Sequence, residues 1–138
     1  MSVEQRTGYG FGVKLKLPYD EAIERTKAAL KEQGFGVLTE IDVRKTMKEK
    51  LDVDFRRYII LGACNPPLAH QAFTAEIDIG LLLPCNVVVY EVEGGSIVAA
   101  MDPGAALGLV KNPALDRIAE EVDARLRMAL ESLTPVDA

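Results

Sequence analysis

The stretch that decides the fold is Cys85-Asn86-Val87-Val88-Val89-Tyr90-Glu91-Val92-Glu93, then Gly94-Gly95, then Ser96-Ile97-Val98-Ala99-Ala100-Met101-Asp102. Two apolar, β-branched runs that flank a pair of glycines are typical of a β-hairpin. With the glycines as the turn, the expected cross-strand pairs are Val92–Ile97, Tyr90–Ala99 and Val88–Met101. These six side chains share one face, which we expect to be buried under helices.

The opposite face of this hairpin is also apolar in its middle, with Val87, Val89, Val98 and Ala100, while Glu91, Glu93 and Asp102 lie nearer its ends. An apolar sheet surface is costly to leave in water. We therefore expect a second subunit to cover it, which predicts a homodimer through a sheet face or edge.

The rest of the chain alternates between strand and helix patterns. Period-two alternation favours strands at 9–17, 35–41 and 57–63, and helical spacing favours helices at 20–34, 42–51, 66–76 and 113–133. Asp20, Asp42, Asn65 and Asn112 are expected N-caps. Together the elements predict an α+β fold: one domain over 1–138, with a mixed or antiparallel sheet of about five strands and helices on one face.

Composition excludes several classes of function. The 138 residues are 49% hydrophobic and 27% charged, and 16 Lys+Arg against 21 Asp+Glu give a formal net charge of −5. No basic block is present, so we expect no nucleic-acid partner. The N-terminal residues have no apolar signal region, and the longest uncharged run, 58–75, contains two prolines. We expect no membrane partner and a cytoplasmic location, where Cys64 and Cys85 stay reduced.

The candidate site is the pair of Cys-Asn dipeptides. Cys64-Asn65 ends a predicted strand and Cys85-Asn86 begins one, so the chain could return both cysteines to one end of the sheet. The single histidine, His70, follows Cys64 by six residues. We therefore take Cys64, Asn65, His70, Cys85 and Asn86 as candidate binding residues for a small ligand or a soft metal. Zinc or copper would be held by Cys64, Cys85 and His70, with a fourth position open.

Two other interpretations stay open. Cys64 precedes a helix and could be the nucleophile of a thiol-dependent enzyme, although Pro66 and Pro67 remove two backbone donors that would stabilise its thiolate. Alternatively, both cysteines are small buried core side chains in a structural or interaction protein without a small-molecule site. The cysteine spacing lacks a Cys-x-x-Cys pair, and no Gly-x-Ser-x-Gly or His-Glu-x-x-His motif is present.

Three stretches carry a likeness to a known family. They are Gly34-Phe35-Gly36-Val37-Leu38-Thr39-Glu40-Ile41-Asp42-Val43, Cys64-Asn65-Pro66-Pro67-Leu68-Ala69 and Gly80-Leu81-Leu82-Leu83-Pro84-Cys85-Asn86-Val87-Val88-Val89-Tyr90. In this order they resemble the domain-of-unknown-function 302 family, over about residues 9–133. The resemblance implies a small α+β domain of bacterial or archaeal type. It implies no catalytic residues, since the family has no assigned activity.

Overall fold

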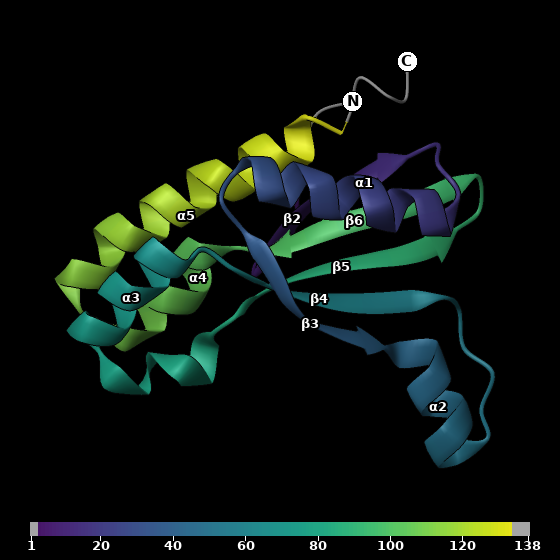
Figure 1. The fold of residues 1–138 in the computed structure, drawn as a ribbon, viewed down its shortest axis with the longest axis horizontal. Helices are drawn as coiled ribbons and strands as arrows, with labels where there is room; N and C mark the ends of the chain where they lie inside the picture. The colour runs from purple at the N-terminus through teal and green to yellow at the C-terminus, as the bar shows by residue number, and fades with distance from the viewer. Residues whose placement is uncertain (1–2, 134–138) are drawn as a thin grey trace.

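The computed structural model describes residues 3–133, and its six strands form one antiparallel sheet in the order β1-β2-β6-β5-β4-β3 (Figure 1). The strands are β1 (Glu4–Thr7), β2 (Gly10–Leu15), β3 (Gly36–Asp42), β4 (Tyr58–Cys64), β5 (Cys85–Val92) and β6 (Gly95–Met101). The helices are α1 (Tyr19–Glu32), α2 (Val43–Leu51), α3 (Pro66–Ala75), α4 (Pro103–Leu107) and α5 (Pro113–Glu131), with short 3-10 turns η1 (Ile77–Leu82) and η2 (Gly108–Val110). The predicted α+β class is confirmed, with six strands in place of about five.

The core lies between one face of the sheet and the helices α1 and α5, which cross it together in Figure 1. Alternate side chains of the four central strands are buried beneath them: Phe11, Val13, Leu15, Ile59, Leu61, Val87, Val89, Val98 and Ala100. The helices contribute Leu30, Leu115, Leu126 and Leu130, all with no exposed surface. Burial of each Val, Leu, Ile or Phe side chain in these lists contributes about 1.5–3 kcal/mol relative to an exposed one. This apolar layer therefore stabilises the packing of the helices on the sheet.

The prediction of which hairpin face is buried is wrong. Val87, Val89 and Val98 lie in the core, covered by the chain's own helices, and need no second subunit. The alternate side chains of the hairpin, among them Val88, Tyr90 and Ala99, are half-buried on the other face. The physical reason is the β2–β6 pairing, which sets Phe11 beside Ala100 and so extends the strongly apolar face of β2 across the hairpin.

The hairpin register also differs from the prediction by two residues. Val92 pairs with Gly95 and Tyr90 with Ile97, so Glu93 and Gly94 form the turn. Gly94 has a φ of 80°, a conformation that other residues rarely adopt. A shift of two leaves each side chain on its own face, so this error did not cause the inversion.

Most predicted helix starts are confirmed by their caps. The side-chain oxygen of Asn65 accepts a hydrogen bond from the Leu68 amide at 3.3 Å, and Asp42 accepts one from the Lys45 amide at 3.0 Å. Asp20 is the exception, because α1 begins at Tyr19 and places Asp20 in its first turn. Caps therefore fix where the chain leaves β4 and enters α3, at the candidate site.

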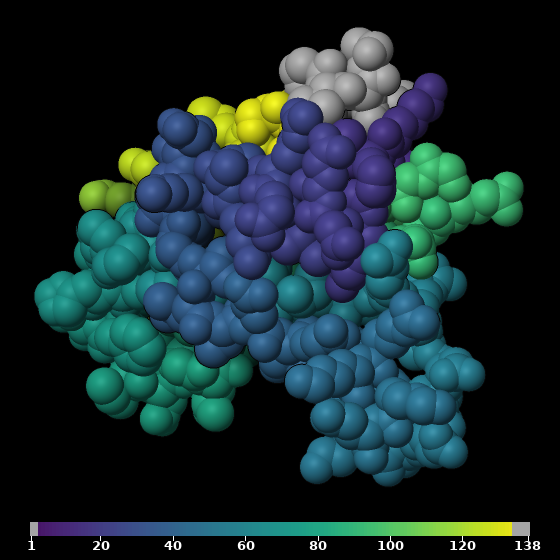
Figure 2. Space-filling view, turned by 45° about the vertical axis from the view of Figure 1, so that its right-hand side comes forward, coloured from purple at the N-terminus to yellow at the C-terminus, as the bar shows by residue number. Residues whose placement is uncertain are grey.

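Helix α2 stands off the body of the molecule, as the lobe at the lower right of Figure 2. None of its residues is buried: Val43 and Met47 are half-buried, and Leu51 is 65% exposed. Its predicted apolar stripe therefore does not reach the core.

No helix within residues 3–133 is long and apolar enough to cross a membrane.

Candidate functional site

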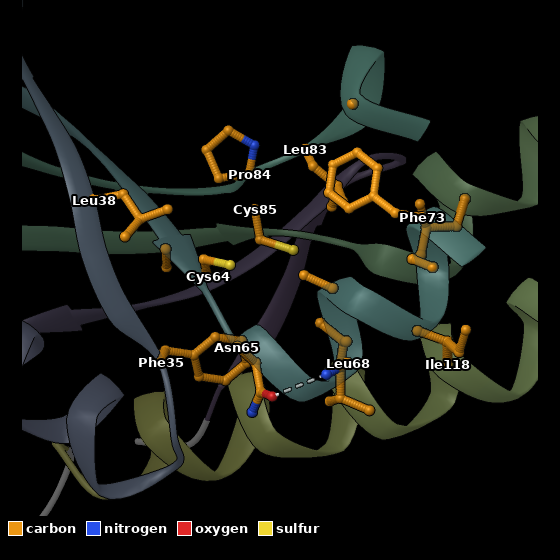
Figure 3. Close-up of a pocket in the computed structure, with 16 residues that line it drawn as sticks. Phe35, Leu38, Cys64, Asn65, Leu68, Phe73, Leu83, Pro84, Cys85 and Ile118 are labelled. Carbon is orange, nitrogen blue, oxygen red and sulfur yellow. Dashed lines mark hydrogen bonds between the residues drawn. The ribbon is translucent and has the colours of Figure 1, made fainter. Parts of the chain in front are cut away.

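The two cysteines meet at one end of the sheet. β4 ends at Cys64 and β5 begins at Cys85, and these strands are antiparallel neighbours in which Ala63 pairs with Cys85. The end of one strand therefore lies beside the start of the other. In Figure 3 the sulfur atoms of both residues are directed into the same space.

That space is a cavity of about 250 Å³ between the sheet end and the helices α3 and α5. Apart from the two thiols and Asn65, its lining is apolar, with Phe35, Leu38, Leu68, Phe73, Leu83 and Ile118 among the residues that form it. No Asp, Glu, His, Lys or Arg of the described chain belongs to this lining. The cavity is therefore suited to an apolar ligand of modest size.

Asn65 is the polar group of the cavity wall, and its hydrogen bonds hold the local backbone. It is 8% exposed, its oxygen caps α3 and its Nδ2 donates to the carbonyl of Gln33 at 3.5 Å. These bonds tie the start of α3 to the end of α1. Asn65 thus shapes the cavity through the backbone it fixes.

Burial sets the ionisation of both thiols. Burial, and to a smaller degree the neighbouring Cys64, raises the pKa of Cys85 to about 11, and the Cys85 residue is 5% exposed. Burial also raises the pKa of the half-buried Cys64. Both groups are therefore neutral thiols at physiological pH, because the cavity disfavours a thiolate.

The structure leaves the other two predicted site residues outside the cavity. His70 lies exposed on α3 and is not part of the lining, and Asn86 lies exposed one residue beyond Cys85, on the opposite side of the strand. Among residues 3–133, no group of three or more His, Cys, Asp or Glu is placed to hold a metal ion. The sequence thus located three of its five candidates in one place: Cys64, Asn65 and Cys85.

Sequence reasoning missed Leu38 and the helical wall of the cavity. Val37 pairs with Ala63 and Thr39 with Gly62, so Leu38 is an extra residue in a bulge of β3. Bulges re-aim side chains, and this one places Leu38, 67% exposed, at the cavity. The apolar stripe of α5 did signal Ile118 and Val122, but as core residues, because a stripe does not reveal where packing leaves space.

Comparison with known proteins places the chain in a family. Residues 11–133 match the family model described as domain of unknown function DUF302. The chain belongs to the DUF302 family. A DUF302 crystal structure, that of an uncharacterized conserved protein from Bacillus stearothermophilus, is 33% identical, with a TM-score of 0.84 over 90% of this chain and 97% of that chain. No curated protein matches the chain. The resemblance noted in the sequence is confirmed, and DUF302 membership fixes the fold without assigning an activity.

Proposed function

We propose that this DUF302 chain is a binding module for a small apolar ligand, held in the cavity at the Cys64/Cys85 end of the sheet. The observation that carries the proposal is the cavity itself, about 250 Å³ with an almost wholly apolar lining. Well-packed interiors leave few voids larger than one water molecule. A space of this size inside a 138-residue chain is therefore a feature to explain.

The cavity volume limits the ligand. A methylene group fills about the same volume as a water molecule, ~30 Å³, so the cavity accommodates a chain of about eight carbons or one substituted aromatic ring. Leu38 and Phe73, which are 67% and 40% exposed, mark where the lining meets solvent.

The ionisation of the thiols favours binding over nucleophilic catalysis. A catalytic thiol is a thiolate near neutral pH, which requires a nearby cation, histidine or open helix N-terminus. Here burial raises the pKa of Cys64 and Cys85, and no cationic side chain from the described part of the chain, residues 3–133, lines the cavity. The N-terminus of α3 is capped by Asn65 and begins with Pro66 and Pro67.

The test is a titration with 1-octanol, followed by NMR shifts and by the midpoint of thermal unfolding. Ala69 lines the cavity and is half-buried, so Ala69→Leu fills the space without entering the packed core. Ala124→Leu, at an exposed position of α5, is the matched control. We expect saturable octanol binding by the parent and the control, and its loss in Ala69→Leu. Equal binding by all three would contradict the proposal.

The same preparation distinguishes the alternatives. Titration of cuprous ion and zinc into the parent, Cys64→Ser, Cys85→Ser and His70→Ala tests a soft-metal module, which requires uptake that both cysteine variants lose. Fast reaction of Cys64 alone with iodoacetamide at neutral pH would support a thiol-dependent enzyme. Absence of octanol binding, metal uptake and fast alkylation would favour a structural or interaction protein.

We also propose a homodimer through the β3 edge of the sheet. β3 is seven residues long and pairs with β4 on one side, and its Ile41 is 49% exposed. A two-fold axis would pair β3 with its own copy. Ile41→Lys should then give a monomer mass by light scattering, while Leu109→Lys, at a 72% exposed site on η2, should not. A parent that is monomeric at high micromolar concentration would contradict the dimer.

A cytoplasmic location remains a proposal, supported by two unpaired cysteines.

A further inference from the structure

A polar groove adjoins the apolar cavity at the cysteine end of the sheet. It has a volume of about 510 Å³ and lies between α3 and α5, beside the turn from α1 to β3. Its lining includes Asn65, Leu68, Gln71, Arg117, Glu121 and Arg125. Asn65, Leu68 and Ile118 line both the groove and the cavity, and in Figure 3 they lie along one side of the cavity. The two hollows are therefore neighbours that share one wall.

Leu68 is the most exposed residue of the shared wall. Asn65 and Ile118 are 8% and 7% exposed, whereas Leu68 is half-buried on α3. The route between the two hollows with the least buried lining is therefore over Leu68. A ligand that extends along this route has one part among apolar side chains and the other part among polar ones.

The groove carries a positive charge that the cavity lacks. Its charged side chains are Arg117, Glu121 and Arg125, which follow one another at four-residue spacing on one side of α5. Nε of Arg125 donates to Oε2 of Glu121 at 2.7 Å, so these two charges compensate each other. Arg117 forms no ion pair with any residue in 3–133. The groove therefore has one uncompensated cation.

Hydrogen bonds to one backbone carbonyl join the groove to the cavity. The carbonyl oxygen of Gln33 accepts from Nη1 of Arg125 at 3.2 Å and from Nδ2 of Asn65 at 3.5 Å. Gly34 follows Gln33, and a Cβ on it would lie 3.7 Å from Nη1 of Arg125 and 3.0 Å from Nδ2 of Asn65. Glycine therefore leaves the space beside these two donors free of a side chain, and the end of the groove nearest the cavity has a fixed geometry.

We propose that the cavity and the groove together bind a medium-chain carboxylate, with its alkyl chain in the cavity and its carboxylate paired with Arg117. This inference rests on the proposed function, because the alkyl chain occupies the same apolar cavity. The cavity volume of about 250 Å³ sets the chain at about eight carbons. The guanidinium of Arg117 matches a carboxylate in shape and charge, and the exposed amide of Gln71 offers a further donor.

The charge of the groove favours a carboxylate over a phosphate. Two arginines and one glutamate give the groove a net charge of +1, which one carboxylate balances. A phosphate monoester carries about −1.5 to −2 near neutral pH, and its second charge would meet Glu121. Three other acids of α5 line a different hollow, so they do not add to this repulsion: Asp116, Glu120 and Asp123.

The experiment titrates the full chain with sodium octanoate, 1-octanol and octyl phosphate at pH 7.5, followed by calorimetry and backbone NMR. Octanoate should bind saturably and shift residues 117–125, which octanol leaves unchanged, and octyl phosphate should bind more weakly than octanoate. Arg117→Gln should weaken octanoate about fivefold and leave octanol within about twofold, and Arg117→Lys should restore most of the loss. Arg44→Gln is the matched control, because Arg44 is also exposed on a helix and forms no ion pair within residues 3–133. Ala69→Leu should abolish binding of both octanoate and octanol.

The outcomes separate this inference from the function on which it rests. Octanol binding without octanoate binding, or the same octanoate affinity in Arg117→Gln and Arg44→Gln, would overturn the carboxylate site and leave the apolar cavity as the binding site. Octanoate binding that survives Ala69→Leu would place the alkyl chain outside the cavity and overturn the inference as well. Octyl phosphate binding tighter than octanoate would overturn the choice of a carboxylate. If neither octanol nor octanoate binds, both the inference and the proposed function fail. Circular dichroism establishes that each variant is folded.

Discussion

The thiol of Cys85 lies close enough to Cys64 for the two to interact electrostatically within one cavity. Burial is the larger cause of the raised pKa of Cys85, and its interaction with Cys64 raises that pKa further. Two antiparallel strand ends produce this arrangement, because the chain leaves β4 at one cysteine and enters β5 at the other. The result is an apolar chamber with two neutral sulfur atoms on its wall.

The first prediction concerns alkylation. A thiol with a pKa of about 11 is ionised in roughly one molecule in ten thousand at pH 7. Native protein should therefore react slowly with iodoacetamide, with Cys64, the half-buried thiol, ahead of Cys85. Mass spectrometry of tryptic peptides after timed quenching gives both rates. In Cys64→Ser the pH midpoint of Cys85 alkylation should fall, and an unchanged midpoint would show that the sulfurs do not interact.

The second prediction concerns stability in alkali. The pKa of Cys85 rises from 9.0 in the unfolded chain to about 11 in the folded one, so between these values the unfolded chain loses its proton first. The free energy of unfolding should therefore fall by about 2 kcal/mol between pH 9 and pH 11 because of this group. Urea unfolding at both pH values measures the loss.

The control for this loss is Cys85→Val, which keeps the position apolar and removes the titrating group. Tyr19, whose pKa burial raises to about 12, and Tyr58, whose pKa burial also raises, contribute equally to both proteins. The variant should lose less stability over the same interval. Equal losses would assign the alkaline sensitivity to the tyrosines alone.

The sequence predicted the strands and helices well, because local patterns determine them. Asn65 and Asp42 marked two helix starts through a cap that each side chain forms with its own next turn. The hairpin faces were predicted the wrong way round, because their burial depends on β2, whose pairing with β6 joins residues almost ninety positions apart. Strand β1 and helix α4 were missed, since neither has an apolar periodicity of its own.

The candidate site also combines features that follow from local sequence patterns with features that depend on long-range packing. Cys64 and Cys85 were placed correctly at neighbouring strand ends, since an antiparallel return requires it. The prediction that His70 lies at this site was wrong, because His70 is exposed to solvent on helix α3. The cavity was not foreseen, since an empty volume depends on how side chains from β3, α3 and α5 fail to fill the space between them. A bulge at Leu38 contributes to it, and bulges depend on pairing with another strand.

The third prediction tests the close approach of β2 and β6. A Cβ on Gly12 would lie 2.5 Å from the carbonyl oxygen of Val98 and 3.0 Å from the Cα of Ala99, both backbone atoms that cannot rotate away. Gly12→Ala should therefore lower the free energy of unfolding by about 3 kcal/mol. Gly36→Ala in β3 is the control, since nothing lies within 4 Å of its Cβ, and it should change stability by less than ~0.5 kcal/mol. Equal urea midpoints for the two variants would contradict the register of β2 on β6.

The last prediction concerns a buried hydroxyl that joins the hairpin to the start of the chain. Ser96, with no exposed surface, donates a hydrogen bond from Oγ to the carbonyl of Leu17 at 2.9 Å. Leu17 follows β2 and precedes α1, so this bond holds the segment that leads into the helix layer. Ser96→Ala leaves that carbonyl without its donor and should cost about 1–2 kcal/mol by urea unfolding.

Ser132→Ala is the matched control for this bond. Its Oγ donates to the carbonyl of Ala129 at 2.6 Å, but Ser132 is an exposed residue and water can replace this bond. The control should therefore lose less than ~0.5 kcal/mol. If the two variants lose the same amount, the buried bond of Ser96 contributes no more than one that solvent can replace, and the coupling between hairpin and helix layer must come from apolar packing alone.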